Sequence, residues 1–303
     1  MSMKIVILSR GPANYTTSRL KEVALARGHD VLIVNYAKCY MTIEKGNPVV
    51  YYKGEKLTGI DAIIPRIAHS YTKYGSAVVR QFETQGVYTT ASSIAIVRSR
   101  DKLRSYQILA RQGVGVPKTV FARETADFDE VIELAGGAPV IIKVARGTHG
   151  TGVVLAETRK AAKAVMQAFF VEGVSFLVQE FIEESAGQDI RALVVGGRVV
   201  ASVERQSLDE DFRSNIHQGG VGKPVKLTDE ESKTAIKAAR AMGLPVCGVD
   251  MMRSGRGPLV LEVNSSASIM TPEKITGRNV AEKMIDYVER NAKARHRKDR
   301  VGA

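Results

Sequence analysis

The chain has 303 residues, of which 44% are hydrophobic and 25% charged, and its formal net charge is +12. This composition is ordinary for a globular protein, and the length favours two or three lobes over one core. No apolar run approaches the roughly 18 residues that span a bilayer, and the first residues lack the arrangement of a signal peptide, so we expect a cytoplasmic protein without membrane contact. Cys39 and Cys247 lack a metal-type spacing and are expected to be free thiols.

The first third of the chain, residues 1–98, is predicted to be an α/β domain. Apolar runs predict three strands, and an amphipathic helix that ends at Gly28 connects the first two; the strands are expected at residues 4–9, 31–35 and 62–65. Strand, helix and strand in succession indicate a parallel sheet. Ser9-Arg10-Gly11-Pro12 follows the first strand in place of Gly-x-Gly-x-x-Gly, which argues against a nicotinamide enzyme.

The rest of the chain is predicted to form two further lobes and a tail. The middle lobe, residues 99–185, begins within a helical stretch at 93–112 and contains a helix at 159–170 and strands at 138–144, 152–155 and 175–182. The last lobe, residues 186–291, is strand-rich, with hairpins at 189–205 and 246–264 and helices at 229–242 and 279–291. Residues 292–303 form a basic tail.

The tail carries several arginines and lysines against the single acidic residue Asp299. One interpretation is attraction to RNA or another acidic partner. The other is a solvated, frayed terminus. We favour the second, because no aromatic residues that could stack on bases interleave with the charges.

A glycine-rich segment follows a predicted strand that ends in Lys143. It reads Gly147-Thr148-His149-Gly150-Thr151-Gly152, and its backbone N–H groups could form a nest for an anion. It is not a P-loop, because no Gly-Lys-Ser/Thr ends it and a strand follows. A flexible hairpin turn explains the glycines equally well. A lysine ending a buried strand needs an anionic partner, however, and this favours phosphate binding.

Asp250, Glu262 and Asn264 are a candidate metal site. Glu262 and Asn264 lie two apart on one predicted strand and so point to the same face, and a hairpin centred near Arg256 places Asp250 opposite Glu262. Three oxygen-bearing side chains without His or Cys indicate magnesium or manganese rather than zinc. The alternative is a surface hairpin with its polar residues outward, which the strongly apolar flanks disfavour.

Three weaker features complete the candidate residues. The predicted strand ending at Glu180 and Phe181 leaves the middle lobe and could offer backbone groups to an adenine edge. Asp189 and Arg191 alternate onto one face beside Arg205, although a cross-strand pair of Arg191 with Glu204 is an alternative. The polar, glycine-ended segment 212–220, which contains His217, is typical of an active-site loop.

Together these residues resemble the ATP-grasp superfamily and, more narrowly, the RimK family of glutamate ligases that modify a ribosomal protein at its C-terminus. The matching stretches run in order through nearly the whole chain, at residues 64–67, 80–83, 98–105, 137–139, 152–158, 212–215 and 257–264. The resemblance implies an α/β (α+β) ATP-grasp fold preceded by an N-terminal parallel-sheet, pre-ATP-grasp domain. It also implies a homo-oligomer, either a dimer or a tetramer.

The resemblance implies a role for each matched residue. ATP would be bound by Lys102, Lys143, Gly147, Gly150, Gly152, Glu180, Phe181, Asp189, Arg213, Ser214 and Asn215. Two magnesium or manganese ions would be bound by Asp250, Glu262 and Asn264. Substrate would contact Arg66, His217, Gln218, Ser266, Ala267 and Ser268. Lys143 and Arg205 would act in catalysis, with Arg205 stabilising the oxyanion formed when an amine attacks an acyl phosphate.

The sequence departs from the family pattern near the substrate. Ala267-Ser268 follows Ser266 where the family has Pro-Gly, and Gln218 replaces an arginine that could clamp a carboxylate. His149 replaces a common glutamine. The leading hypothesis is therefore a ligase that adds L-glutamate to a protein or peptide C-terminus. Alternatives are a ligase for another amino acid or a small-molecule acceptor, a nucleotide-binding protein without catalysis, and an RNA-binding module.

Overall fold

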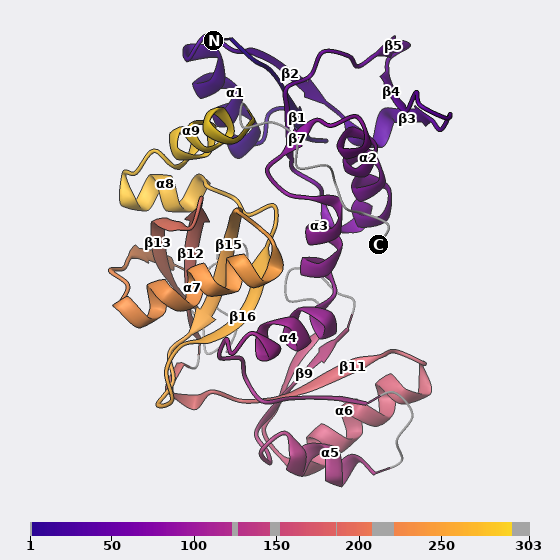
Figure 1. Ribbon diagram of the computed structural model, residues 1–303. Coiled ribbons are helices and arrows are strands. Elements are labelled where there is room, and N and C mark those ends of the chain that lie inside the picture. Colours follow the sequence, from indigo (N-terminus) through magenta and orange to yellow (C-terminus); the bar gives the residue numbers. More distant parts are fainter. Residues whose placement is uncertain (1, 123–126, 146–151, 186, 208–220, 293–303) are drawn as a thin grey trace.

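A four-stranded parallel sheet in the order β2-β1-β6-β7 forms the first lobe. The computed structural model describes residues 2–122, 127–145, 152–185, 187–207 and 221–292 (Figure 1). The lobe contains β1 (Lys4–Leu8), α1 (Tyr15–Ala26), β2 (Asp30–Val34), β6 (Ala62–Pro65), α2 (Thr72–Thr84) and β7 (Tyr88–Thr89). The three strands predicted from apolar runs are present, and their parallel pairing is confirmed.

A small antiparallel sheet extends from this lobe. It consists of β3 (Cys39–Thr42), β4 (Val49–Tyr52) and β5 (Glu55–Lys56), and the short helices η1 (Tyr36–Lys38) and η2 (His69–Tyr71) lie before it and after β6. Asn35 starts η1, where its side chain accepts a hydrogen bond from the Ala37 N–H at 3.0 Å. The sequence analysis did not predict this sheet.

Two helices, not one, connect the first lobe to the middle lobe. α3 (Ser93–Arg100) ends and α4 (Lys102–Arg111) begins at Asp101, whose backbone is extended. The Asp101 carboxylate accepts a hydrogen bond from the Arg104 N–H at 3.0 Å and so caps α4. The expectation of one helical stretch over 93–112 was therefore wrong at this residue, and the break places Lys102 in the first turn of α4.

The middle lobe is an antiparallel sheet in the order β10-β9-β11-β8 with two helices packed on it. Its elements are β8 (Thr119–Ala122), α5 (Phe128–Leu134), β9 (Val140–Val144), β10 (Val153–Ala156), α6 (Arg159–Val171) and β11 (Phe176–Glu180). Apolar side chains from all of these elements share one core.

The last lobe is a five-stranded antiparallel sheet in the order β14-β13-β12-β15-β16. Its elements are η3 (Glu183–Ser185), β12 (Gln188–Val195), β13 (Arg198–Gln206), β14 (Val221–Pro224), α7 (Asp229–Met242), β15 (Val246–Met252), β16 (Leu259–Asn264), α8 (Met270–Thr276) and α9 (Val280–Ala292). Both predicted hairpins are present, and the strands place Asp250 opposite Glu262 as expected. Helix α9 lies against α1 of the first lobe (Figure 1).

The first and last lobes share their hydrophobic cores. One core joins Val6 and Phe82 of the first lobe to Val249 and Val260 of the last, and a second joins Ile5 to Ile285. The middle lobe instead has a core of its own. Among the described helices, none is long and apolar enough to cross a membrane.

Candidate active site

A row of charged side chains crosses four neighbouring strands of the last lobe. Asp189 of β12 lies directly opposite Arg205 of β13, and Arg191 of β12 lies opposite Asp250 of β15. Asp250 in turn lies opposite Glu262 of β16. Direct cross-strand neighbours have their side chains close together on one face, so the sheet register alone assembles this row.

Two guanidinium groups hold the Asp250 carboxylate. Arg191 donates from Nε and Nη2 at 2.7 and 2.5 Å, and Arg205 Nη2 lies 3.0 Å from Oδ2. Arg205 also donates from Nε to Asp189 at 2.7 Å and forms a second bond to the same carboxylate through Nη2. Asp250, Asp189 and Arg205 are all at most 6% exposed, so this is a buried network of charges.

The two neighbouring carboxyl groups have opposite pKa shifts. Burial opposes ionisation of Asp250, but Arg191 and Arg205 outweigh it and hold the pKa of Asp250 well below its usual range. The protein packed around Glu262 and the nearby Asp250 raise the pKa of Glu262, although solvent still reaches this side chain. The fold therefore stabilises the ionised form of Glu262 less than that of Asp250, and a bound cation would stabilise it further.

The donor set fits a hard divalent cation. Asn264 donates from Nδ2 to Glu262 Oε1 at 2.8 Å and lies 3.4 Å from Asp250 Oδ2, so the three side chains converge as the sequence predicted. An amide turned by 180° would present Oδ1 instead, and the site would then offer oxygens alone. In the described part of the chain, no cluster of three or more His, Cys, Asp or Glu side chains forms a different metal site.

Lys143 and Lys102 bring positive charge to the same site from two other elements. Burial lowers the pKa of Lys143 to about 8, and Glu262 opposes this shift. Burial also lowers the pKa of Lys102, with Lys143 acting in the same direction and Glu262 against it. The two ammonium groups and Glu262 are therefore within Coulombic reach of one another, as expected for groups that share one polyanionic ligand.

Gln179 fixes the direction of Lys143. The Lys143 ammonium donates to Gln179 Oε1 at 2.6 Å, and Gln179 Nε2 donates to Thr119 Oγ1 at 2.7 Å. Gln179 is 2% exposed, and both ends of its amide are bonded, so it cannot turn away without losing both contacts. The role of Gln179 in orienting Lys143 was not predicted from the sequence. The available signal for this role was its position next to Glu180 on a buried strand.

Glu180 lies where the middle lobe meets the last one. Its Oε1 accepts a hydrogen bond from the Lys118 N–H at 2.5 Å. The same oxygen forms an ion pair with Arg256, which lies in the turn between β15 and β16. Phe181 follows directly after β11 and is partly buried. The predicted adenine contacts thus lie at a junction of the two lobes, and their role stays a prediction.

Gly152 closes the β9–β10 hairpin for a steric reason. Its φ is +76°, and a Cβ there would lie 2.2 Å from Val144 Cγ2, so no other residue fits. Several other predicted site residues lie outside the described residues: Gly147, Gly150, Arg213, Ser214, Asn215, His217 and Gln218. The basic tail lies outside them as well.

The predicted substrate residues that the structure describes, Arg66, Ser266, Ala267 and Ser268, lie at the contact between the first and last lobes. Arg66, directly after β6, donates from Nη1 to the Ala267 carbonyl oxygen at 2.8 Å. Ser266 has a buried hydroxyl without a hydrogen-bond partner among the described residues. Ser268 accepts a hydrogen bond from the Met270 N–H at 3.3 Å and so helps to begin α8. The structure thus brings Arg66 to the segment that departs from the family pattern.

One alternative from the sequence was wrong. Arg191 does not pair with Glu204, because the register places Val203 opposite Arg191 and turns Glu204 to the other face. Glu204 instead pairs with Lys223 at 2.6 Å and Arg253 at 3.3 Å. The sequence placed Arg191 on one face with Asp189, but its pairing with Asp250 could be recognised only once the β12–β15 pairing was known.

Two family models match the chain over almost all of its length. Residues 3–96 match the RimK PreATP-grasp domain, and residues 99–288 match the RimK-like ATP-grasp domain. The chain belongs to the RimK family. The family resemblance and the ATP-grasp fold class expected from the sequence are therefore confirmed.

Curated relatives and solved structures agree with this membership. A protein of Maridesulfovibrio salexigens named probable alpha-L-glutamate ligase is 55% identical over 96% of each chain, and one of Picosynechococcus with the same name is 54% identical over 99% of each. The fold is similar to that of the RimK domain protein ATP-grasp from Sphaerobacter thermophilus, with a TM-score of 0.70, 20% identity and 94% and 99% of the two chains covered. The ATP-grasp ligase PsnB, solved with a minimal precursor, has a TM-score of 0.75 at 18% identity over 95% and 99%.

Proposed function

We propose that this protein is an ATP-dependent α-L-glutamate ligase that joins an acceptor carboxylate to the amine of L-glutamate through an acyl phosphate. The observation that carries this proposal is the convergence of Lys102 and Lys143 on the Asp250–Glu262–Asn264 cluster. Relatives more than 50% identical over nearly the whole chain are named as α-L-glutamate ligases. The nucleotide is ATP, and the cation is magnesium or manganese.

The cation sites follow from the chemistry of the donors. Glu262 and Asn264 would hold the cations together with Asp250, whose remaining acceptor capacity is limited by its bonds to Arg191. A bound divalent cation would supply positive charge that neutralises the phosphate oxygens. We infer two ions of magnesium or manganese, because hard oxygen donors suit both metals.

The first chemical step transfers the γ-phosphoryl group to the acceptor. An acceptor carboxylate oxygen attacks the γ-phosphorus, the bond to the β-phosphate oxygen breaks, and ADP leaves. Lys143, oriented by Gln179, and Lys102, in the first turn of α4, neutralise charge on the phosphate oxygens. Lys143 lies on β9 and Lys102 in α4, so regular secondary structure positions both residues before the reaction.

The second step forms the amide. The glutamate amine attacks the acyl carbon, the C–O bond to phosphate breaks, and the amine loses a proton as phosphate leaves. We propose that Arg205 stabilises the oxyanion of this step. Its Nε and Nη2 are committed to Asp189, so Nη1 is the nitrogen that would face the substrate.

The acceptor that the family resemblance favours is the C-terminus of a ribosomal protein. The enzyme would then work in the cytoplasm, where buried thiols such as Cys39 and Cys247 stay reduced. A homo-oligomer remains part of the proposal.

The test is acceptor-dependent release of ADP. The protein is incubated with ATP, magnesium or manganese, single amino acids, and either ribosomal proteins, C-terminal peptides or small carboxylates, while ADP and product mass are followed. We expect a mass increase of one or more glutamate residues on a peptide or protein acceptor. Product formed only with a small carboxylate would favour a small-molecule ligase, and no acceptor-dependent ADP in any combination would contradict the proposal.

A further inference from the structure

Two arginines lie partly buried where the first lobe meets the last, and both donate to backbone carbonyl oxygens. Arg66 donates to the Ala267 carbonyl oxygen at 2.8 Å, and Arg100, the last residue of α3, donates from Nη2 to the Ile67 carbonyl oxygen at 2.9 Å. Within the described ranges, no Asp or Glu forms an ion pair with either guanidinium. Neutral carbonyl oxygens compensate a buried positive charge only in part.

The two guanidinium groups are close enough to disturb each other. Burial, together with the charge of Arg100, lowers the pKa of Arg66 to about 10. Burial also lowers the pKa of Arg100, which Glu262 opposes. Both groups remain charged near neutral pH, so the fold holds two like charges together at a cost that an anion between them would offset.

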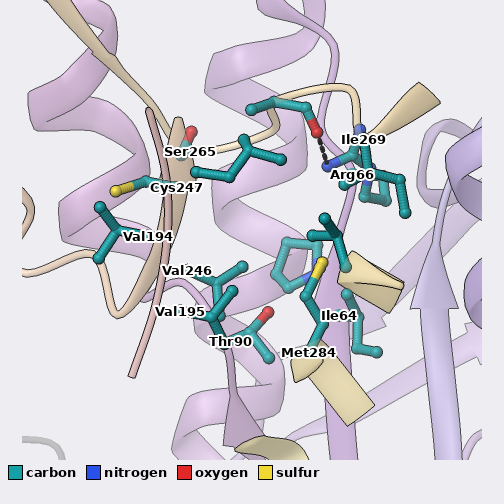
Figure 2. A pocket seen from close by; sticks show the side chains of 14 residues that line it. Ile64, Arg66, Thr90, Val194, Val195, Val246, Cys247, Ser265, Ile269 and Met284 are labelled. Atoms are coloured by element: carbon teal, nitrogen blue, oxygen red, sulfur yellow. Dashed lines mark hydrogen bonds between the residues drawn. The ribbon is translucent and has the colours of Figure 1, made fainter. Parts of the chain in front are cut away.

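Unpaired polar atoms accompany the two charges. Arg100 Nε and the hydroxyl oxygens of Ser265 and Ser266 are buried without a hydrogen-bond partner in the described structure, and Ser265 is only 6% exposed. Arg66, Ser265 and Ala267 also line a cavity of about 20 Å³, in which Figure 2 shows Arg66 bonded to a backbone oxygen. Since buried polar groups are normally paired, unused donors beside two cations indicate an anionic ligand.

The position of Arg100 relative to the metal cluster limits what this ligand can be. Helix α3, which ends at Arg100, packs against β16, which carries Glu262, and the charge of Glu262 acts on Arg100. Arg100 therefore lies near the cluster beside which the acyl phosphate would form. The residues matched to the ATP phosphates are Lys143, on β9 of the middle lobe, and Lys102, in the first turn of α4. A molecule whose amine attacks the acyl phosphate would extend its other polar groups toward the first lobe, where the arginines lie.

We propose that Arg66 and Arg100 form the site that binds a carboxylate of the incoming amino acid. This inference rests on the proposed function and names the residues that select its second substrate. The planar guanidinium fork matches a carboxylate, and the Ser265 and Ser266 hydroxyls can donate to the same group.

The test compares steady-state constants of the wild-type enzyme with those of Arg100→Gln. We expect the KM for L-glutamate to rise about 100-fold, or about 2.8 kcal/mol, while the KM for ATP changes less than about twofold. Arg100→Lys keeps the charge without the fork, and its KM should lie between the two. An Arg100→Gln enzyme with an unchanged KM for glutamate, or with its main defect in the KM for ATP or the acceptor, would overturn the proposal.

The matched control is Arg98→Gln. Arg98 lies on the same helix, two residues and thus about 200° away, so it faces away from Arg100. Its Nε, like that of Arg100, is buried without a hydrogen-bond partner in the described structure, so this variant controls for the loss of such a group and should leave the KM for glutamate unchanged. Thermal unfolding of all variants shows whether each is folded. Comparing L-glutamate with L-glutamine identifies the carboxylate that is bound. If Arg100→Gln loses the preference for L-glutamate over L-glutamine, the site binds the side-chain carboxylate. If the KM for both amino acids rises equally, the site binds the α-carboxylate.

A binding measurement makes the inference independent of turnover. L-glutamate added with magnesium and a non-hydrolysable ATP analogue should raise the unfolding midpoint of the wild-type protein and not that of Arg100→Gln. An inactive wild-type enzyme that still shows this difference would contradict the proposed function but not the anion site. If the wild-type enzyme is active but L-glutamate shifts its unfolding midpoint by the same amount as that of Arg100→Gln, the anion site alone would be contradicted.

Discussion

Asp250 and Glu262 are adjacent carboxylates with different roles in the structure. Asp250 compensates Arg191 and Arg205, whereas Glu262 faces solvent and the two lysines. The sequence predicted that both belong to one oxygen-donor cluster, because alternation along a strand and a hairpin register are local properties. It could not predict that Arg191 neutralises Asp250, because that contact depends on β12 pairing with β15, some 60 residues away in the chain.

Replacement of these two carboxylates should therefore separate activity from stability. Glu262→Gln should lower turnover about 100-fold or more, because it weakens binding of the cation that would neutralise the phosphate oxygens. The pKa of Glu262 is raised in the folded chain, so ionisation of Glu262 destabilises the fold as the pH rises above the ordinary pKa of a glutamate. The Glu262→Gln variant should therefore unfold at a slightly higher temperature than the wild-type protein at pH 7 without metal. Solvent access keeps this difference small, and it should vanish as the pH falls below about 4.

Asp250→Asn should also be inactive but much less stable. It removes the carboxylate that pairs with the partly buried Arg191 and leaves the buried Arg205 with Asp189, which costs about 3 kcal/mol. Denaturant unfolding of both variants beside the wild-type protein measures the contrast. Equal stability of Asp250→Asn and Glu262→Gln would show that Asp250 does not have the structural role assigned to it.

Lys143 predicts a pH dependence of ATP binding. Its pKa of about 8 in the folded chain lies below its ordinary 10.5, so its contribution to stability is present above pH 10.5 and is lost as the pH falls through 8. ATP should bind the charged form, and its Kd should therefore rise by up to about tenfold per pH unit above 8. Lys143→Arg stays charged and should show a flat profile in calorimetric titrations between pH 7 and 9. A wild-type profile that is equally flat would contradict the assignment.

At the scale of elements, apolar runs and glycine-bounded hairpins predicted most strands that build the site. They failed at the small sheet of β3 to β5, whose strands are two to four residues long, and at Asp101, where one helix becomes two. A run of good helix formers conceals such a break, because an aspartate inside a helix and an aspartate that caps one look alike in sequence. The break matters for function, since it gives α4 its own start beside Lys102.

The cap at Asp101 should influence ATP binding as well as stability. Asp101→Ala removes the hydrogen bond to the Arg104 N–H and should cost about 1 kcal/mol. The first turn of α4 carries Lys102, so fraying of this turn should also raise the KM for ATP severalfold. The control is Thr158→Ala, which removes the equivalent cap of α6, a bond of 3.1 Å to the Ala161 N–H. It should lower stability by a similar amount without the same rise in KM.

At the scale of the whole molecule, the three lobes form two packed bodies, because the first and last lobes share their hydrophobic cores and the middle lobe has its own. The first and last lobes share two cores, and Arg27 and His29 of the first pair with Glu289 of α9 at 2.7 and 2.8 Å. The middle lobe has a separate core and meets the last lobe through contacts such as Arg256 with Glu180. Sequence patterns marked three stretches but carried no signal for which of them share a core, because core contacts join residues far apart in the chain.

This division predicts which parts move when nucleotide binds. Lys143 belongs to the middle lobe and Glu262 to the last, so ATP and its cations attract both bodies and should draw them together. Fluorescent labels on Val171→Cys and Lys226→Cys, at exposed positions of these two lobes, should therefore show increased energy transfer on addition of magnesium and a non-hydrolysable ATP analogue. The native thiols should not interfere, because Cys39 and Cys247 are at most 4% exposed and burial raises the pKa of both.

The pair Ile43→Cys and Lys226→Cys supplies the control, since Ile43 is 92% exposed on the first lobe. Transfer between these labels should stay constant, because the shared cores prevent the first and last lobes from moving apart. A change in the control pair of similar size would mean that the first lobe moves as a third body. The Arg66–Arg100 site, which spans the contact between those two lobes, would then form only in one of their arrangements, so the control also tests whether that site is present before substrate arrives.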